Sequence, residues 1–280
     1  MLVSANEMLK EAKQKGFAIP STNFVDQISV KAYIRVAEEM GLPLILSYAQ
    51  AHSVYLDIEE AAMLGLFYTK QAQVPIALHL DHGTDFEFIK RAIELGFTSV
   101  MIDASTQALE GNIEITKKVV EFAHKKNIAV EAEIGHVGTG INIGQGEGNA
   151  GDDSIYTTVA DAKQMVEKSG LDSLAISIGT AHGLYKGTPQ INFERLRDLA
   201  QNIQVPLVLH GGSSSGDENL EKCALGGISK INIYTDFVVH AYNHLQERTA
   251  KDYFEIKNLL AQGMEDTLKR YYKVFHTRPV

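Results

Sequence analysis

The chain has 280 residues, of which 45% are hydrophobic, so it can bury one large core. Its formal net charge of −9 comes from 35 acidic and 26 basic residues with no basic run, which argues against a nucleic acid partner. The one cysteine, Cys223, excludes an intrachain disulfide and a four-cysteine metal site and fits a reducing compartment, so we expect a cytoplasmic protein. We expect no signal peptide and no membrane partner, because the start lacks a signal-like apolar region and nowhere do about 18 apolar residues run together.

Short β-rich apolar runs alternate along the chain with longer segments of helical period, a pattern typical of parallel βαβ units. The predicted strands are residues 17–24, 43–48, 74–80, 98–103, 128–134, 173–178, 206–210 and 230–235. Ser53, Thr84 and Asp217 are the predicted caps of three of the intervening helices. Eight such units predict one (β/α)8 TIM barrel domain over residues 1–280, because closure leaves no edge strand, and an open doubly wound sheet is the alternative.

Two segments depart from this repeat. Residues 135–156 are rich in glycine and have no apolar period, which predicts either a mobile cover over an active site or plain disorder. Residues 251–280 predict a C-terminal extension of one or two helices, with Phe254, Leu259 and Leu268 among its apolar positions. The apolar face of this extension could cover the barrel or a neighbouring subunit.

Polar residues collect at the predicted carboxyl ends of the strands, where barrel enzymes place their active sites. Histidines stand there on three strands, as His82, His182 and His210, and each is followed by glycine. A lone histidine is ordinarily a hydrogen-bonded structural residue, whereas three at one rim form the ligand set of a zinc ion with an open coordination position. We therefore predict these three residues as zinc ligands, and we predict His79, one layer deeper, as a supporting or core residue.

Carboxylates accompany the predicted ligands. Asp81 directly precedes His82 and is the predicted general acid or base, with the orienting of a histidine as its alternative role. Glu131 and Glu133 lie on one face of the fifth strand, where either could support a ligand histidine, hold a second cation or pair with a lysine inside the barrel. The one lysine at a strand end, Lys230, lies at the wrong end of the eighth strand for a Schiff-base mechanism.

The stretches after the last two strands indicate a phosphate site. Gly211-Gly212-Ser213 follows the seventh strand, and Asn232-Ile233-Tyr234-Thr235 ends the eighth. Barrels commonly bind phosphate at this position through backbone N–H groups and a helix N-terminus.

Together these residues resemble the class II fructose-bisphosphate and tagatose-bisphosphate aldolases over nearly the whole chain. The runs that carry the resemblance are IALHLDHG (76–83), VEAEIG (130–135), DSLAI (172–176), GTAHG (179–183) and VPLVLHG (205–211). The resemblance implies that Asp81 is the acid/base and that His82, His182 and His210 bind one Zn²⁺ per subunit. It also implies a dihydroxyacetone phosphate site with a monovalent cation (Na⁺ or K⁺) nearby and subunits paired as a homodimer or homotetramer. The residues it assigns to that site are Gly183, Gly211, Ser213, Asn232 and Thr235.

By this resemblance zinc polarises the carbonyl of a phosphorylated ketose while Asp81 moves the proton of the C4 hydroxyl. Three departures from the family pattern affect the half of the site that binds the aldehyde part of the substrate. The next glutamate after Glu133 comes only at Glu147, the bulky Tyr234 replaces a small or acidic residue, and Lys257 stands where the family has an arginine for a second phosphate. We therefore expect a ketose 1-phosphate or a 1,6-bisphosphate as substrate.

Two other functions remain open at this stage. A metal-dependent barrel hydrolase would place a His-x-His pair on the first strand, and residues 20–24 contain no histidine. A non-catalytic barrel that binds sugar phosphates would need neither Asp81 nor three histidines.

Overall fold

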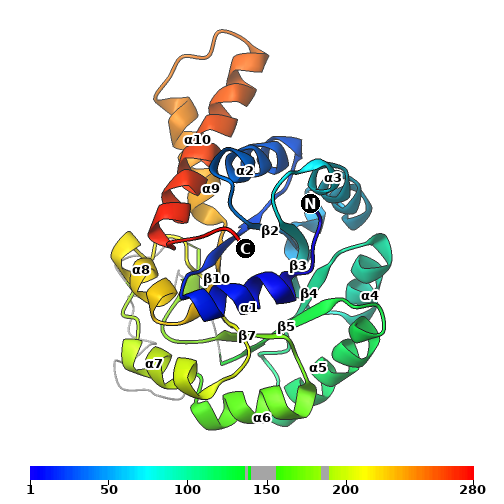
Figure 1. Ribbon diagram of the computed structural model, residues 1–280. Coiled ribbons are helices and arrows are strands. Elements are labelled where there is room, and N and C mark those ends of the chain that lie inside the picture. The colour runs from blue at the N-terminus through cyan, green and yellow to red at the C-terminus, as the bar shows by residue number, and fades with distance from the viewer. Residues whose placement is uncertain (136–137, 140–155, 184–188) are drawn as a thin grey trace.

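The computed structural model describes residues 1–135, 138–139, 156–183 and 189–280. Eight parallel strands close into a barrel in the order β1–β10–β9–β7–β5–β4–β3–β2, as Figure 1 shows, which confirms the predicted fold. The strands are β1 (Ile19–Asn23), β2 (Leu44–Ala49), β3 (Ile76–Gly83), β4 (Ser99–Ile102), β5 (Ala129–Ile134), β7 (Ser173–Ile176), β9 (Leu207–Leu209) and β10 (Ile228–Ile233). A separate short sheet pairs β6 (Gly138–Thr139) with β8 (Ala181–His182).

Helices surround the barrel and bury one face each against it. They are α2 (Gln27–Met40), α3 (Ile58–Gln71), α4 (Phe86–Leu95), α5 (Leu109–His124), α6 (Val159–Ser169), α7 (Phe193–Asn202), α8 (Asp217–Leu225) and α9 (Thr235–Gln246). In α4, for example, Ile89, Ala92 and Ile93 are buried at helical spacing between charged neighbours. This burial explains why the helical period of the sequence is so regular.

The three predicted helix caps were wrong by one to four residues. Asp57 caps α3, Asp85 caps α4, and Gly216 precedes α8, so that Asp217 is its first helical residue. Ser53 instead belongs to a 3-10 turn, η1 (Gln50–Val54), in which its hydroxyl donates to the Gln50 carbonyl at 2.7 Å. Asp57 and Asp85 are the caps because a side-chain oxygen at this position accepts hydrogen bonds from the first N–H groups of the helix.

The eighth strand also lies earlier than predicted. It covers Ile228–Ile233, and Thr235 already begins α9. Lys230 is consequently not at a strand end, because it sits in the middle of β10 with only 1% of its surface exposed.

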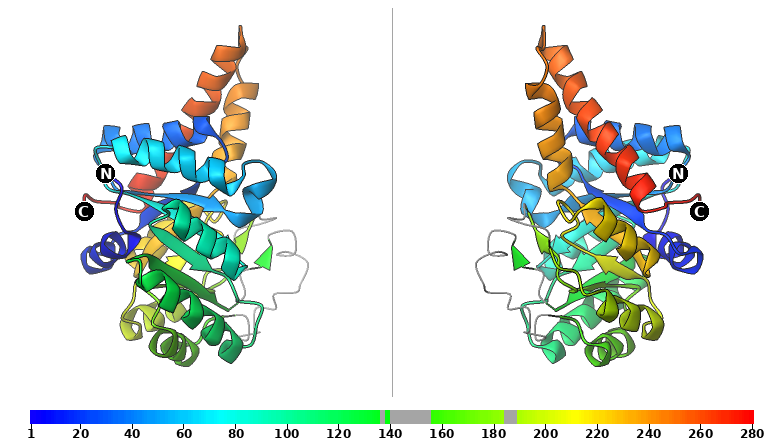
Figure 2. Two further views of the ribbon diagram at one scale, coloured as in Figure 1. Left: turned by 90° about the vertical axis from the view of Figure 1, so that its right-hand side faces the viewer. Right: turned by 90° about the vertical axis from the view of Figure 1, so that its left-hand side faces the viewer.

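Helix α1 (Ala5–Lys15) closes the end of the barrel opposite the predicted site. Its residues Met8, Leu9 and Ala12 form one apolar cluster with Ile19 of β1 and Ile45 of β2. Figures 1 and 2 show α1 and both chain ends on this side of the molecule. The carboxyl ends of the strands are therefore the accessible end.

The C-terminal extension is one helix, α10 (Tyr253–Val274), which packs against α9 and α2. Its second half buries Met264, Leu268 and Tyr272 against the barrel, so this part of its apolar face covers the barrel. Its first half projects from the barrel with the end of α9, as Figure 2 shows, and Phe254 there is 73% exposed. Within the described part of the chain, no helix is both long and apolar enough to cross a membrane.

Candidate active site and metal centre

A cavity of about 270 Å³ lies at the carboxyl ends of the strands. Ten residues singled out from the sequence line it, namely Asp81, His82, His182, Gly183, His210, Gly211, Ser213, Asn232, Tyr234 and Thr235. Four that were not foreseen line it as well, Asn23, Ala49, Ala51 and His52. The predicted site residues therefore converge on one cavity, with Gly212 and Glu133 outside its lining.

The three predicted ligand histidines face one another in this cavity. Nitrogens of His82, His182 and His210 all lie within 4.8 Å of one another, and the Nε2 atoms of His82 and His182 are 3.2 Å apart. Two nitrogens bound at about 2.0–2.1 Å to the same tetrahedral ion stand at nearly this separation. The histidine set thus fits a zinc ion without rearrangement of the strands that carry it.

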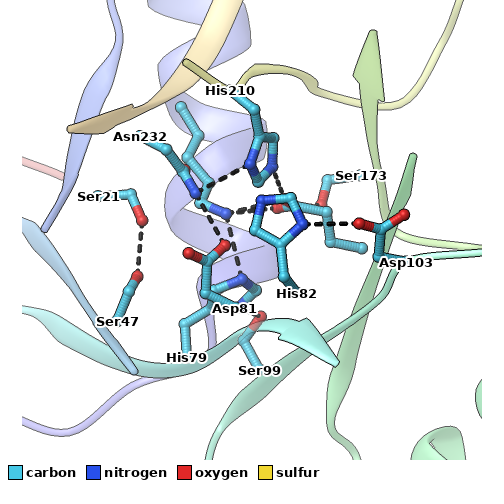
Figure 3. A network of polar contacts seen from close by, with 12 residues as sticks. Ser21, Ser47, His79, Asp81, His82, Ser99, Asp103, Ser173, His210 and Asn232 are labelled. Atoms are coloured by element: carbon cyan, nitrogen blue, oxygen red, sulfur yellow. Dashed lines mark hydrogen bonds and ion pairs between the residues drawn. The ribbon is translucent and has the colours of Figure 1, made fainter. Parts of the chain in front are cut away.

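Two of these rings each contact a carboxylate of their own. Asp103, just beyond β4, contacts His82 Nδ1 at 2.8 Å, and Glu131 of β5 contacts His210 Nε2 at 2.9 Å. Figure 3 shows the His82–Asp103 pair and the ring of His210 above it. Each contact fixes the ring. The other nitrogen of His82 faces His182, and that of His210 lies 3.2 Å from Asn232 Nδ2. A carboxylate behind the ring is common for metal-bound histidines.

A bulge in β3 places two consecutive side chains in the cavity. The pairing of β3 with β4 shifts between Leu80 and Gly83, and His82 adopts a left-handed backbone with φ of 47°. In a regular strand Asp81 and His82 would point to opposite faces. The extra residue of the bulge re-aims one of them, so both reach the cavity, and the uncommon backbone at His82 marks a functional position.

Asp81 is buried and receives two amide hydrogen bonds. Asn23 Nδ2 donates to its Oδ2 at 2.8 Å, and Asn232 Nδ2 donates to its Oδ1 at 2.9 Å. Burial would raise the pKa of Asp81, but its interactions with the ring of His82 and with the Lys230 cation outweigh burial and hold the pKa well below its usual range. Asp81 is therefore ionised, and both of its carboxylate oxygens are held in a fixed orientation.

The histidines of the cavity differ in pKa. Burial lowers the pKa of His82, but Asp81 and the Asp103 hydrogen bond outweigh it and raise that pKa to about 9. Burial and the charge of His82 lower the pKa of His182 to about 3. Without a metal, the cluster thus carries its proton on His82, because a second positive charge beside it is unfavourable.

Below the cavity, Glu131 pairs with Lys230 inside the barrel. Lys230 Nζ contacts both carboxylate oxygens, at 2.8 and 2.9 Å, and lies 3.1 Å from His79 Nε2. His79 Nδ1 in turn contacts Ser99 Oγ at 2.8 Å, and burial and Lys230 lower the pKa of His79 to about 3. The lysine pair considered for this strand is present at Glu131, and His79 supports it without reaching the cavity.

Glu133 belongs to a second group of possible ligands. Atoms of His82, Asp103 and Glu133 lie within 4.8 Å of one another. Asp103 was missed as a site residue, although it ends the predicted fourth strand and the strand-end rule applies to it.

The predicted phosphate side of the cavity is formed by β9, β10 and the start of α9. Gly211 has a φ of 66°, and a side chain there would meet the Ala181 carbonyl at 2.4 Å. Only glycine lets the loop after His210 lie against the segment carrying His182. Ser213 Oγ accepts from the N–H groups of Tyr234 and Asp236 and so fixes the N-terminus of α9 beside the cavity.

Gly212 and Lys257 do not line the cavity. Gly212 packs against β10, where its N–H donates to the Asn232 carbonyl at 3.1 Å, so it supports the cavity from outside. Lys257 lies in the projecting half of α10, with Nζ 5.6 Å from the centre of the Tyr253 ring. Nearly all of the predicted cover, residues 135–156, including Glu147, lies outside the described residues.

Residues 3–278 match the family described as fructose-bisphosphate aldolase class-II. The chain belongs to this family. A fructose-bisphosphate aldolase of Staphylococcus epidermidis is 35% identical over 284 residues, covering 99% of this chain and 98% of that protein. One of Geobacillus stearothermophilus is 37% identical over 254 residues, covering 90% of this chain and 87% of its own length.

Solved aldolase structures have the same fold. The YdjI aldolase of Escherichia coli K12 is 31% identical, with a TM-score of 0.88 over 98% of this chain and 97% of that one. A putative fructose-1,6-bisphosphate aldolase of Coccidioides immitis is 28% identical, with a TM-score of 0.86 over 97% of this chain and 96% of that one. The protein is thus an aldolase of the class II family, which is metal-dependent in general and acts on phosphorylated sugars. The hydrolase and the non-catalytic barrel find no support in these comparisons.

Proposed function

We propose that this aldolase reversibly cleaves a phosphorylated ketose into dihydroxyacetone phosphate and an aldehyde, with one zinc ion held by His82, His182 and His210. The observation that carries the proposal is the convergence of three histidines and one ionised carboxylate on a single cavity. A bound zinc ion would supply Lewis-acid polarisation of the ketose carbonyl.

Asp81 performs the proton transfer in this proposal. As the C3–C4 bond breaks, its carboxylate accepts the proton of the C4 hydroxyl, and the electron pair of that bond passes to the dihydroxyacetone phosphate half. The amides of Asn23 and Asn232, at 2.8 and 2.9 Å, keep the carboxylate aimed at this hydroxyl. A second proton must then reach C3, and we propose Glu147, the next glutamate along the chain after Glu133, as its donor.

The phosphate of the dihydroxyacetone half is placed at Ser213 and Thr235. Thr235 is the first residue of α9, and the N-terminus of a helix attracts anions through its partial positive charge. Gly183 and Gly211 line the same side of the cavity, where the absence of side chains lets a ligand approach the backbone closely. A monovalent cation near this phosphate is part of the proposal on the family resemblance alone.

A coupled assay of dihydroxyacetone phosphate release tests the proposal. Wild type and Asp81→Asn would be compared on ketose 1-phosphates and 1,6-bisphosphates, each with added zinc and with a chelator. We expect metal-dependent release by the wild type and a fall in kcat of about 10²–10⁴-fold in the variant, which keeps the shape of the carboxylate without its charge. Zinc-bound wild type that releases nothing from any substrate would refute the proposal.

A further inference from the structure

The cavity has a second side, formed by residues that the chemistry above does not use. His52 of η1 and Tyr234 at the end of β10 lie with ring centres 4.5 Å apart and ring planes at 44°. Both line the cavity, together with Ala49 and Ala51. We call these four residues the aldehyde wall.

His52 is held in place by a network around its 3-10 turn. Thr84 N–H donates to Gln50 Oε1 at 2.9 Å, which ties the start of the turn to the loop after β3. Tyr48 OH lies 3.0 Å from Ser53 Oγ and donates to the Leu56 carbonyl at 2.6 Å, which ties its end. The ring of His52 therefore meets a ligand without first having to become ordered.

The ring has hydrogen-bonding capacity that the described protein does not use. His52 Nδ1 is buried without any hydrogen-bond partner. Burial lowers the pKa of His52 and Asp81 raises it, with burial the larger effect, so the ring is neutral. A neutral imidazole offers one donor and one acceptor, which suits a hydroxyl group.

The rest of the cavity fixes which part of the substrate meets this wall. In the proposed function the phosphate lies at Ser213 and Thr235, the carbonyl at the three histidines and the C4 hydroxyl at Asp81. The chain of the sugar beyond C4 is then left with the remaining side of the cavity, between Asn23 and the aldehyde wall. This is the half of the substrate that leaves as the aldehyde.

The described residues of the aldehyde wall favour an uncharged chain over one that ends in a phosphate. Among the described residues that line the cavity there is no lysine and no arginine. A second phosphate is ordinarily bound by such cations, with charge-assisted hydrogen bonds. Asn23, His52 and Tyr234 offer uncharged polar groups and ring faces, and the two alanines leave space for a carbon chain.

We infer that His52 and Tyr234 determine substrate specificity, and that the substrate is a ketose 1-phosphate whose chain beyond C4 carries hydroxyl groups and no second phosphate. This inference rests on the proposed function, since it assigns the half of the same site that the proposed chemistry does not use. His52 hydrogen-bonds a hydroxyl beyond C4, and the ring of Tyr234 lies along the carbon chain. Neither residue takes part in proton transfer.

The test runs the reaction in the direction of synthesis, with dihydroxyacetone phosphate and three aldehydes. Propanal, glyceraldehyde and glyceraldehyde 3-phosphate have the same three carbons and add first hydroxyls and then a phosphate. For the zinc-loaded wild type we expect kcat/KM for glyceraldehyde to exceed that for propanal by about 10-fold. We expect no gain from the phosphate of the third aldehyde.

His52→Phe is the decisive variant, because it keeps a ring against Tyr234 and removes both nitrogens. We expect it to lose the preference for glyceraldehyde while kcat/KM for propanal stays within about 2-fold of the wild type. Should it fail to fold, His52→Leu removes the same nitrogens, and His52→Gln should restore part of the preference. Val54→Ala, in the same turn but 79% exposed, is the matched control and should behave as wild type.

Each outcome has one meaning. Equal losses with propanal and glyceraldehyde in His52→Phe would overturn the role of His52. A wild-type kcat/KM for glyceraldehyde 3-phosphate about 10-fold above that for glyceraldehyde would overturn the assigned substrate class, yet leave the aldolase itself intact. Failure of the wild type with all three aldehydes would instead refute the proposed function from which the inference starts.

Discussion

The two sides of the cavity are built differently. On the side of the proposed zinc ligands, here called the metal side, His82 and His210 each have a carboxylate partner, and Asp81 has two amide donors. On the aldehyde wall, two alanines stand beside one ring pair, and a ring nitrogen of His52 has no partner. The reacting part of the site is thus fixed by several interactions per residue, whereas specificity depends on two side chains. Changes on the first side should impair the protein or its chemistry, and changes on the second should alter which substrate is used.

The largest effect is expected for Lys230→Met, which removes the support beneath the metal side. It leaves Glu131 buried and charged without its cation, a loss that typically costs about 3–5 kcal/mol. Denaturant unfolding should therefore show a lower free energy of unfolding. The double variant Lys230→Met/Glu131→Gln should recover part of the loss, and a single variant as stable as the wild type would contradict the role of the pair.

The next effect concerns metal affinity. Asp103→Asn replaces the carboxylate that orients His82, and a change of this kind typically weakens metal binding by about 10–100-fold. Zinc competition titration would measure it. Asp172→Asn is the matched control, because Asp172 forms the same type of pair with His124, 2.8 Å apart and away from the cavity. Equal affinities in both variants would show that Asp103 does not act through His82.

Metal binding should also depend on pH. With a pKa of about 9, His82 is protonated at pH 7 in the metal-free protein, and a ligand histidine must be neutral. Each bound zinc ion should therefore displace about one proton, and affinity should fall about 10-fold for each pH unit below 9, with other ligands unchanged. Calorimetry in buffers of different ionisation enthalpy would count that proton. A pH-independent affinity between pH 7 and 9 would contradict the assignment of the proton to His82.

The smallest effect is expected on the aldehyde wall. Tyr234→Ala removes the ring that packs against His52, and an aromatic contact of this kind is worth about 0.5–1.5 kcal/mol. The KM for ketose 1-phosphates should rise about 2–10-fold, with kcat nearly unchanged. A fall in kcat comparable with that of Asp81→Asn would instead place Tyr234 on the chemical side of the cavity.

The barrel was predictable because its signals are local and repeated. Alternating apolar runs and helical periods located all eight strands, and strand ends placed His82, His182 and His210 on one rim. The rule that polar residues at strand ends are candidates would also have found Asp103 and Asn23 had it been applied to every strand. Helix caps were less predictable, because several polar residues compete for each start and the geometry of the turn decides among them.

The closed barrel and the residues at its mouth follow from the amino-acid pattern alone, since period and strand order follow from burial along the chain. The contacts that those residues make depend instead on how the strands and loops come together. The inward position of Lys230 depends on the register of β10, and the joint entry of Asp81 and His82 depends on a bulge in β3. His52 had no signal in the sequence, because its place beside Tyr234 is set by a 3-10 turn and a residue 182 positions away, and such contacts exist only once the barrel has closed.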